Sequence, residues 1–168
     1  MSLVDINPKS KIQNPKSSAP QSLTFALLGN PNTGKTTLYN RLCGVRAKTA
    51  NFPGSTVEAR IGQHIDDDGS RTFIVDLPGI YSLYLDRPES KVCRDYLTGQ
   101  IHLNRDPDAL LIVVDATNLP RNLVFACQAL QLGLPAVVAL NMIDLAQRRG
   151  LTVNTNELSQ YLGVPVVP

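Results

Sequence analysis

The sequence has 168 residues, 43% of them hydrophobic, which suits one domain with a buried core. The first 21 residues hold three lysines and one aspartate, so the totals of 16 basic and 14 acidic residues leave 13 of each in the remainder. This neutral remainder lacks the excess of basic residues typical of nucleic-acid-binding domains, and its longest apolar runs, 109–114 and 134–140, are too short to span a bilayer.

Residues 1–21 are rich in lysine, proline, serine and asparagine and have no apolar period. Such a composition cannot bury a core and predicts a flexible tail, whose first three residues resemble a vector remnant. We therefore place the folded domain at residues 22–168 and expect it to be soluble, with no nucleic-acid partner.

The apolar residues 23–28 are typical of a buried strand and lead into residues 29–36, which read GNPNTGKT. This segment fits the phosphate-binding loop pattern G-x-x-x-x-G-K-[ST], and a helix containing residues 37–42 is expected after it. The glycines lack Cβ, so backbone N–H groups can curve around a polyphosphate. The predicted nucleotide-binding residues here are Gly29, Asn30, Pro31, Asn32, Thr33, Gly34, Lys35, Thr36 and Thr37.

Two side chains of this loop have distinct predicted roles. Lys35 is expected to reach the β- and γ-phosphates and to act in catalysis by offsetting their charge. Thr36 is expected to offer its hydroxyl to Mg²⁺, and the positive end of the helix dipole favours the anion. The alternative, a Gly-rich turn without a ligand, is disfavoured by the strand before the loop and the helix after it.

Residues 45–56 are rich in small and turn-forming residues and are predicted to be a loop. Its Thr56 is the best candidate for a catalytic threonine that completes Mg²⁺ coordination. Ser55 is the rival candidate, and an exposed loop hydroxyl is the plain alternative. Residues 57–65 then alternate in polarity like a half-exposed edge strand, and a turn at 66–70 makes them antiparallel to a strand at 71–75.

Asp76 and Gly79 follow that strand in the pattern D-x-x-G. Asp76 is predicted to hold Mg²⁺ through water, and the N–H of Gly79 is predicted to reach the γ-phosphate and to act in catalysis. The alternative interpretation is a strand-ending aspartate followed by a Pro-Gly turn.

Two further helices are predicted. The first has a cap formed by Asp86 and Glu89 and a buried face of Val92, Cys93, Tyr96 and Leu97. The second covers 120–132 and ends at Gly133, with a buried face of Leu123, Ala126, Cys127 and Leu130. The three cysteines have no C-x-x-C spacing, which fits a reducing compartment, and each is expected to pack in the core.

Asn141 and Asp144 follow a predicted strand at 135–140 in the pattern N-x-x-D. The Asp144 carboxylate can accept two hydrogen bonds from guanine, whereas adenine lacks the exocyclic amine. Asn141 is expected to tie this loop to the phosphate loop and touch the base, and Met142 to supply an apolar contact. In isolation the pattern is also typical of a turn or helix cap. A P-loop ATPase is an alternative function, and Asp144 in its N-x-x-D context argues against it.

Strands and helices alternate along the chain, which predicts an α/β fold, and the phosphate loop, D-x-x-G and N-x-x-D patterns in this order resemble those of the P-loop GTPase fold. We expect an open, mostly parallel sheet with one antiparallel edge strand, helices on both faces, and nucleotide at the strand ends. Residues 163–168 are predicted to be the last parallel strand. The domain would then be truncated before the final base-contacting loop of GTPases, usually S-A-x.

The sequence from residue 23 to 168 resembles the cytosolic GTP-binding domain of the bacterial ferrous iron transport protein B family. The resemblance is carried by the sequence segments GNPNTGKTTLYNRLCG, NFPGSTVE, DLPGIYSL, PESKVCRDYL, VVDATNLPRNL and ALNMIDLA. It implies a regulatory domain on the cytoplasmic side of the inner membrane, fused to helical and transmembrane parts that carry iron(II). The alternative is a soluble GTPase of ribosome assembly or tRNA modification. Self-association of the domain is left open.

The resemblance also implies how GTP would be hydrolysed to GDP. Ras-type GTPases place a water-orienting glutamine directly after D-x-x-G, but Ile80 stands there, so slow intrinsic hydrolysis is expected. In the resembled family a K⁺ ion near the nucleotide helps, which implies a K⁺ role for Asn32 and for carbonyls near Asn51 and Phe52. A loop-shaping role for Asn32 is the equal alternative.

Overall fold

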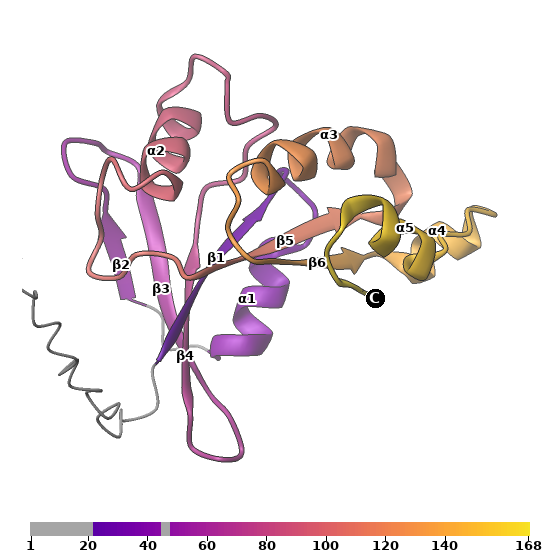
Figure 1. The fold of residues 1–168 in the computed structure, drawn as a ribbon, viewed down its shortest axis with the longest axis horizontal. Helices are drawn as coiled ribbons and strands as arrows, with labels where there is room; N and C mark the ends of the chain where they lie inside the picture. Colours follow the sequence, from indigo (N-terminus) through magenta and orange to yellow (C-terminus); the bar gives the residue numbers. More distant parts are fainter. Residues whose placement is uncertain (1–21, 45–47) are drawn as a thin grey trace, which may run out of the picture.

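The computed structural model describes residues 22–44 and 48–168 (Figure 1), so the predicted tail at 1–21 lies outside the described residues. Within these two ranges, seven strands form one sheet in the order β2-β3-β4-β1-β5-β6-β7. The strands are β1 Leu23–Gly29, β2 Lys48–Asn51, β3 Glu58–Ile65, β4 Arg71–Asp76, β5 Ala109–Asp115, β6 Ala136–Asn141 and β7 Val166–Val167. The helices are α1 Lys35–Cys43, α2 Pro88–Leu97, α3 Leu119–Leu130, α4 Ile143–Arg148 and α5 Thr155–Leu162, with a short 3-10 turn at Ala116–Asn118.

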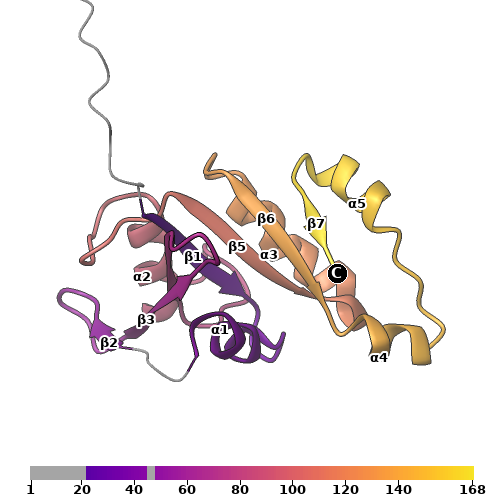
Figure 2. The same ribbon diagram turned by 90° about the horizontal axis from the view of Figure 1, so that it is seen from below.

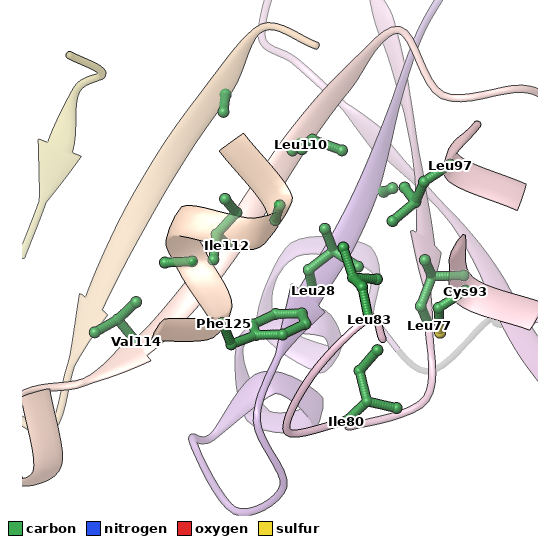
Figure 3. Close-up of a cluster of buried hydrophobic side chains, with 14 of the residues drawn as sticks. Leu28, Leu77, Ile80, Leu83, Cys93, Leu97, Leu110, Ile112, Val114 and Phe125 are labelled. Atoms are coloured by element: carbon green, nitrogen blue, oxygen red, sulfur yellow. The ribbon is translucent and has the colours of Figure 1, made fainter. Parts of the chain in front are cut away.

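The strands β4, β1, β5, β6 and β7 pair in parallel, and helices cover both faces of the sheet (Figure 2). Side chains alternate between the faces along each strand, as β geometry requires. In β1, Leu27 packs beneath Tyr39 of α1, while Ala26 and Leu28 belong to the larger cluster on the opposite face with α2 and α3 (Figure 3). The predicted fold class is therefore confirmed.

The antiparallel edge of the sheet contains one strand more than predicted. β3 is antiparallel to β4, as expected, but β2 pairs with β3 on its outer side. The prediction that 57–65 is the outermost strand and that 48–51 belong to a loop is therefore wrong. β2 has the sequence KTAN and is mostly exposed, so it offers no apolar alternation, and backbone hydrogen bonds to β3 define it.

Helix α2 begins differently from the prediction. Arg87 is its N-cap residue, Pro88 occupies the first turn, and no side chain in the described chain caps it. The predicted cap from Asp86 is therefore wrong, and Pro88 starts the helix because its φ is already helical and it has no N–H to satisfy. The predicted apolar face is buried: Val92, Cys93, Tyr96 and Leu97.

Helix α3 buries a face that is rotated from the predicted one. Its buried residues are Asn122, Phe125, Ala126 and Ala129, while Cys127 is exposed. The expectation that every cysteine packs in the core is thus wrong for Cys127. The large ring of Phe125 enters the core cluster (Figure 3) and is accompanied by two small alanines that let the helix approach the sheet.

The C-terminal part follows the prediction. β7 pairs in parallel with β6 and follows the turn at Gly163 that ends α5. Among the described residues, no helix combines the length and the apolar character that crossing a membrane requires.

Candidate functional site

The carboxyl ends of β1, β4 and β6 meet at one edge of the sheet, where parallel α/β sheets bind ligands. A cavity of about 500 Å³ opens there. Its walls come from the phosphate loop, the start of α1 and the segments after β4 and β6. The lining residues are Asn30, Pro31, Asn32, Gly34, Lys35, Thr36, Thr37, Gly79 and Met142.

The phosphate loop has the backbone curvature that anion binding requires. Asn32 and Gly34 have positive φ angles of 66° and 85°, which turn successive N–H groups toward the concave side. The Thr33 hydroxyl donates to the Asn30 carbonyl at 3.0 Å and braces the turn. Within the described residues no side chain caps α1, so the N–H groups of its first turn remain free for an anion.

The loops after β1 and β6 are locked together. Asn141 donates from Nδ2 to the carbonyl of Thr33 at 2.8 Å. A Cβ on Gly34 would lie only 2.1 Å from the same Nδ2 atom, so this contact depends on glycine. The structure thus shows the tie between the two loops that the sequence predicts, whereas contact of Asn141 with a base stays a prediction.

Lys35, which lines the cavity, forms a buried ion pair. The Lys35 ammonium donates to the Asp76 carboxylate, and the two residues are only 9% and 7% exposed. Buried charges need such pairing. The pair places a cation beside the loop where phosphates would lie, because Lys35 lines the cavity.

The segment after β4 lies directly against the phosphate loop. A Cβ on Gly79 would be 3.2 Å from the backbone N and Cα of Pro31, and Ile80 donates its N–H to the Gly29 carbonyl at 3.3 Å. Gly79 therefore lines the cavity because it has no side chain. Any movement of the segment after β4 would therefore displace the phosphate loop or break its contacts with that segment.

Thr56 is not brought to the cavity. It is exposed in a turn closed by a hydrogen bond from the Phe52 N–H to the Val57 carbonyl at 3.1 Å. The hydroxyl of Ser55, its rival, accepts from the Val57 N–H at 3.0 Å. Phe52 anchors this turn, because it is buried and its ring meets that of Tyr96 in α2 at 5.6 Å. The predicted metal role of Thr56 stays a prediction that would need this turn to move.

The two further residues predicted to contact the base, Met142 and Asp144, follow β6. Met142 lines the cavity in a left-handed conformation, with φ 61°. The Asp144 side chain is 77% exposed, and its carboxylate is 4.0 Å from the Arg148 guanidinium. Such a weak surface pair leaves Asp144 free to accept new hydrogen bonds.

Behind the cavity, α1 packs tightly on β3. A Cβ on Gly62 would lie 2.6 Å from the Cys43 sulfur and 2.7 Å from the Tyr39 hydroxyl. Burial, with the Cys43 and Asp76 charges adding to it, raises the pKa of Tyr39 to about 12. Burial, followed by the Asp76 charge, raises the pKa of Cys43 to about 11. Both groups stay neutral near pH 7.

One set of residues near the site was not predicted. A second cavity, of about 200 Å³, shares Pro31 and Gly79 with the first and also contains Arg87, Glu89 and Ser90 of the α2 start. No sequence pattern signals this cavity, since the burial of Ser90 depends on how α2 packs.

Comparison with known proteins identifies the family. The family model described as ferrous iron transport protein B matches residues 23–168. The Fe(2+) transporter FeoB of Salmonella typhimurium is 45% identical over 148 residues, which is 88% of this chain and 19% of the relative. The FeoB of Escherichia coli K12 gives the same values. The chain thus spans about one fifth of the length of these curated relatives.

Solved structures of proteins from the same family are similar to this chain in fold. An S. thermophilus NFeoB mutant bound to mGDP has a TM-score of 0.79 and 45% identity, covering 88% of this chain and 54% of that one. The G domain of the T. maritima FeoB iron transporter has a TM-score of 0.75 and 35% identity, covering 88% of this chain and 86% of that one. The resemblance seen in the sequence is confirmed, and the chain belongs to the ferrous iron transport protein B family.

Proposed function

We propose that this chain is the GTP-binding and GTP-hydrolysing domain of a membrane ferrous iron transporter. The observation that carries the proposal is the lock between the phosphate loop and the N-x-x-D loop at one cavity, the hydrogen bond from Asn141 to Thr33. It joins a phosphate-binding element to a base-reading element. A nucleoside triphosphate has both chemical features.

Guanine selection is assigned to Asp144. Its exposed carboxylate lies in the first turn of α4, directly after Met142 and Ile143, and can accept from the ring N–H and the exocyclic amine of guanine. The S. thermophilus NFeoB structures are described as bound to mGDP and to GDP, which supports the same base here.

Mg²⁺ fits the donor set of the site. The Thr36 hydroxyl and the Asp76 carboxylate supply the oxygen ligands that this ion prefers, and the Lys35 ammonium already balances the buried carboxylate. When bound, Mg²⁺ would neutralise charge on the β- and γ-phosphate oxygens. Thr56 is proposed as a further ligand once its turn moves inward.

Hydrolysis rests on the chain's own donors. Lys35 and the loop N–H groups offset the charge that spreads over the phosphate oxygens as water attacks, and Gly79 offers its N–H to the γ-phosphate. Ile80 contributes nothing polar, because its side chain is 5% exposed and packs in the core beside Leu83 (Figure 3). We therefore propose a slow intrinsic rate.

K⁺ stimulation is proposed through Asn32. This residue lines the cavity on the phosphate loop, and its φ of 66° is unusual for a residue with a side chain. Its amide oxygen is the kind of neutral donor that suits a monovalent cation, and the carbonyls near Asn51 and Phe52 are further candidates.

The iron-transport part of the proposal comes from the relatives, which are named Fe(2+) transporters and are about five times longer than the matched region. The domain would act on the cytoplasmic side of the membrane, with the helical and transmembrane parts of the full-length protein as partners. A GTPase of ribosome assembly or tRNA modification is not favoured, because the family model and the 45% identical relatives are iron transporters.

The test is fractionation of the full-length gene product after washing membranes with high salt and carbonate, which remove peripheral proteins. Retention in the membrane pellet is expected. Recovery in the soluble or ribosomal fraction would overturn the transporter assignment and leave the nucleotide site standing.

A further inference from the structure

The second cavity lies between the phosphate loop and the start of α2. Its volume is about 200 Å³, and Pro31 and Gly79 form walls of both this cavity and the larger one. The two spaces therefore adjoin where the N–H of Gly79 is proposed to meet the γ-phosphate. The lining residues are Pro31, Gly79, Ile80, Tyr81, Leu85, Arg87, Glu89 and Ser90.

Ser90 is the feature that indicates a ligand. It is 1% exposed, lines this cavity, and its hydroxyl has no hydrogen-bond partner among the described residues. Buried hydroxyl groups nearly always have a partner, and an unpaired one destabilises the fold. A small polar ligand in the cavity would satisfy it.

The electrostatics of the α2 start favour an anion. The helix has ten residues, and no side chain in the described part of the chain caps its N-terminus. The first-turn N–H groups, including those of Glu89 and Ser90, therefore lack intrahelical partners, and the helix dipole adds positive potential. Arg87 also lines the cavity, and its guanidinium forms no ion pair within residues 22–44 and 48–168.

We propose that this cavity binds inorganic phosphate, held by the Ser90 hydroxyl, the α2 N–H groups and the Arg87 guanidinium. This proposal rests on the proposed function in one respect: GTP hydrolysis would supply one source of the phosphate. Hydrolysis breaks the bond between the γ-phosphorus and the bridging oxygen, which stays on GDP. The new bond joins that phosphorus to the water oxygen, and the products are GDP, hydrogen phosphate and a proton.

For released phosphate to reach the second cavity, the close contact between Gly79 and Pro31, which border both spaces, must open. Glu89 also lines the cavity, and its carboxylate repels the anion. Binding is therefore weak and reversible, as transit of a product requires.

The first test titrates inorganic phosphate into the full chain saturated with GDP and Mg²⁺, followed by ³¹P NMR. S90A and R87A are each expected to raise the phosphate dissociation constant about fivefold, the effect of one lost hydrogen bond, while E89Q lowers it. Y39F is the matched control for S90A, because Tyr39 on α1 carries another buried hydroxyl without a partner in the described part of the chain. R71A, at the start of β4, is the control for R87A.

The comparison of the variants with wild type decides the matter even if phosphate also binds at the γ-phosphate position. Equal phosphate affinity in wild type, S90A, R87A and E89Q would overturn the proposal, and so would equal losses in the controls. Thermal unfolding separates folding defects from ligand loss. S90A removes a hydroxyl that has no partner within the described ranges, so it should not lower the melting temperature.

A second measurement distinguishes product phosphate from phosphate of the solution. During a single turnover of GTP, cleavage is followed by acid quench and release by a fluorescent phosphate sensor. A delay between the two that shortens in S90A assigns the site to the product, while no delay assigns it to solution phosphate. GDP affinity is measured in the same samples. If GDP does not bind, the proposed function is wrong. If GDP binds but the variants leave phosphate affinity unchanged, only the proposed phosphate site is wrong.

Discussion

Replacing Gly34 with alanine tests the lock between the phosphate loop and the N-x-x-D loop. The φ of Gly34 is 85°, so any side chain there adopts a left-handed conformation that destabilises by about 1–2 kcal/mol. The added Cβ would also lie 2.1 Å from Asn141 Nδ2 and would displace that amide from the Thr33 carbonyl. Loss of this hydrogen bond adds about 1 kcal/mol.

Gly133 is the matched control for this substitution. Its φ is 78°, but a Cβ there would meet no atom of the described residues within 4 Å. G133A should therefore carry the backbone strain alone, and G34A should lower the free energy of unfolding by about 1 kcal/mol more.

The assay is urea unfolding of the nucleotide-free chain followed by circular dichroism, with GDP affinity measured by calorimetry. G34A should also weaken GDP binding by at least about tenfold, the factor that 1.4 kcal/mol gives, whereas G133A should not. Equal unfolding free energies for the two variants, together with unchanged GDP affinity in G34A, would refute the reasoning.

Three further predictions follow from the site and its surroundings. D144A should reduce the preference for GDP over ADP by at least about tenfold in competition binding, since the lost carboxylate is the group that distinguishes the bases; an unchanged ratio would rule out that role. Hydrolysis should be faster in K⁺ than in Na⁺ at matched ionic strength, and N32A should abolish the difference; equal wild-type rates would exclude the cation role of Asn32. Burial raises the pKa of the Cys43 thiol from 9.0 to about 11 and that of Cys93 from 9.0 to about 12. These shifts favour the neutral thiols of the folded state, so their contribution to stability is fully present below pH 9 and is lost as the pH rises toward 11 and 12. Urea unfolding should therefore give a lower free energy of unfolding at pH 10 than at pH 8. An equal free energy of unfolding at both pH values would contradict this prediction.

Sequence patterns predicted the parts of this domain that depend on local chemistry. The phosphate loop could be predicted because only glycine at Gly34 permits both its positive φ and the close approach of Asn141. The central strands could be predicted because they are continuous apolar runs, as parallel strands buried on both faces must be. The tie from Asn141 to the phosphate loop also followed from motif spacing.

The features that escaped prediction depend on tertiary contacts. β2 is defined by its backbone pairing with β3, which its short polar sequence does not signal. The exposure of Cys127 follows from the rotation that Phe125 imposes on α3. The Ser90 hydroxyl, which finds no partner among residues 22–44 and 48–168, and the cavity beside it arise only once α2 packs against the segment after β4.

The central claim is that the cavity at the phosphate loop binds a guanine nucleotide. Calorimetric titration of GDP and of ADP into this chain, each with Mg²⁺, tests it most directly. The structure predicts that GDP binds at least about a hundredfold more tightly than ADP, because only guanine supplies both donors that the Asp144 carboxylate can accept. Equal affinity for the two nucleotides, or binding of neither, would contradict the account.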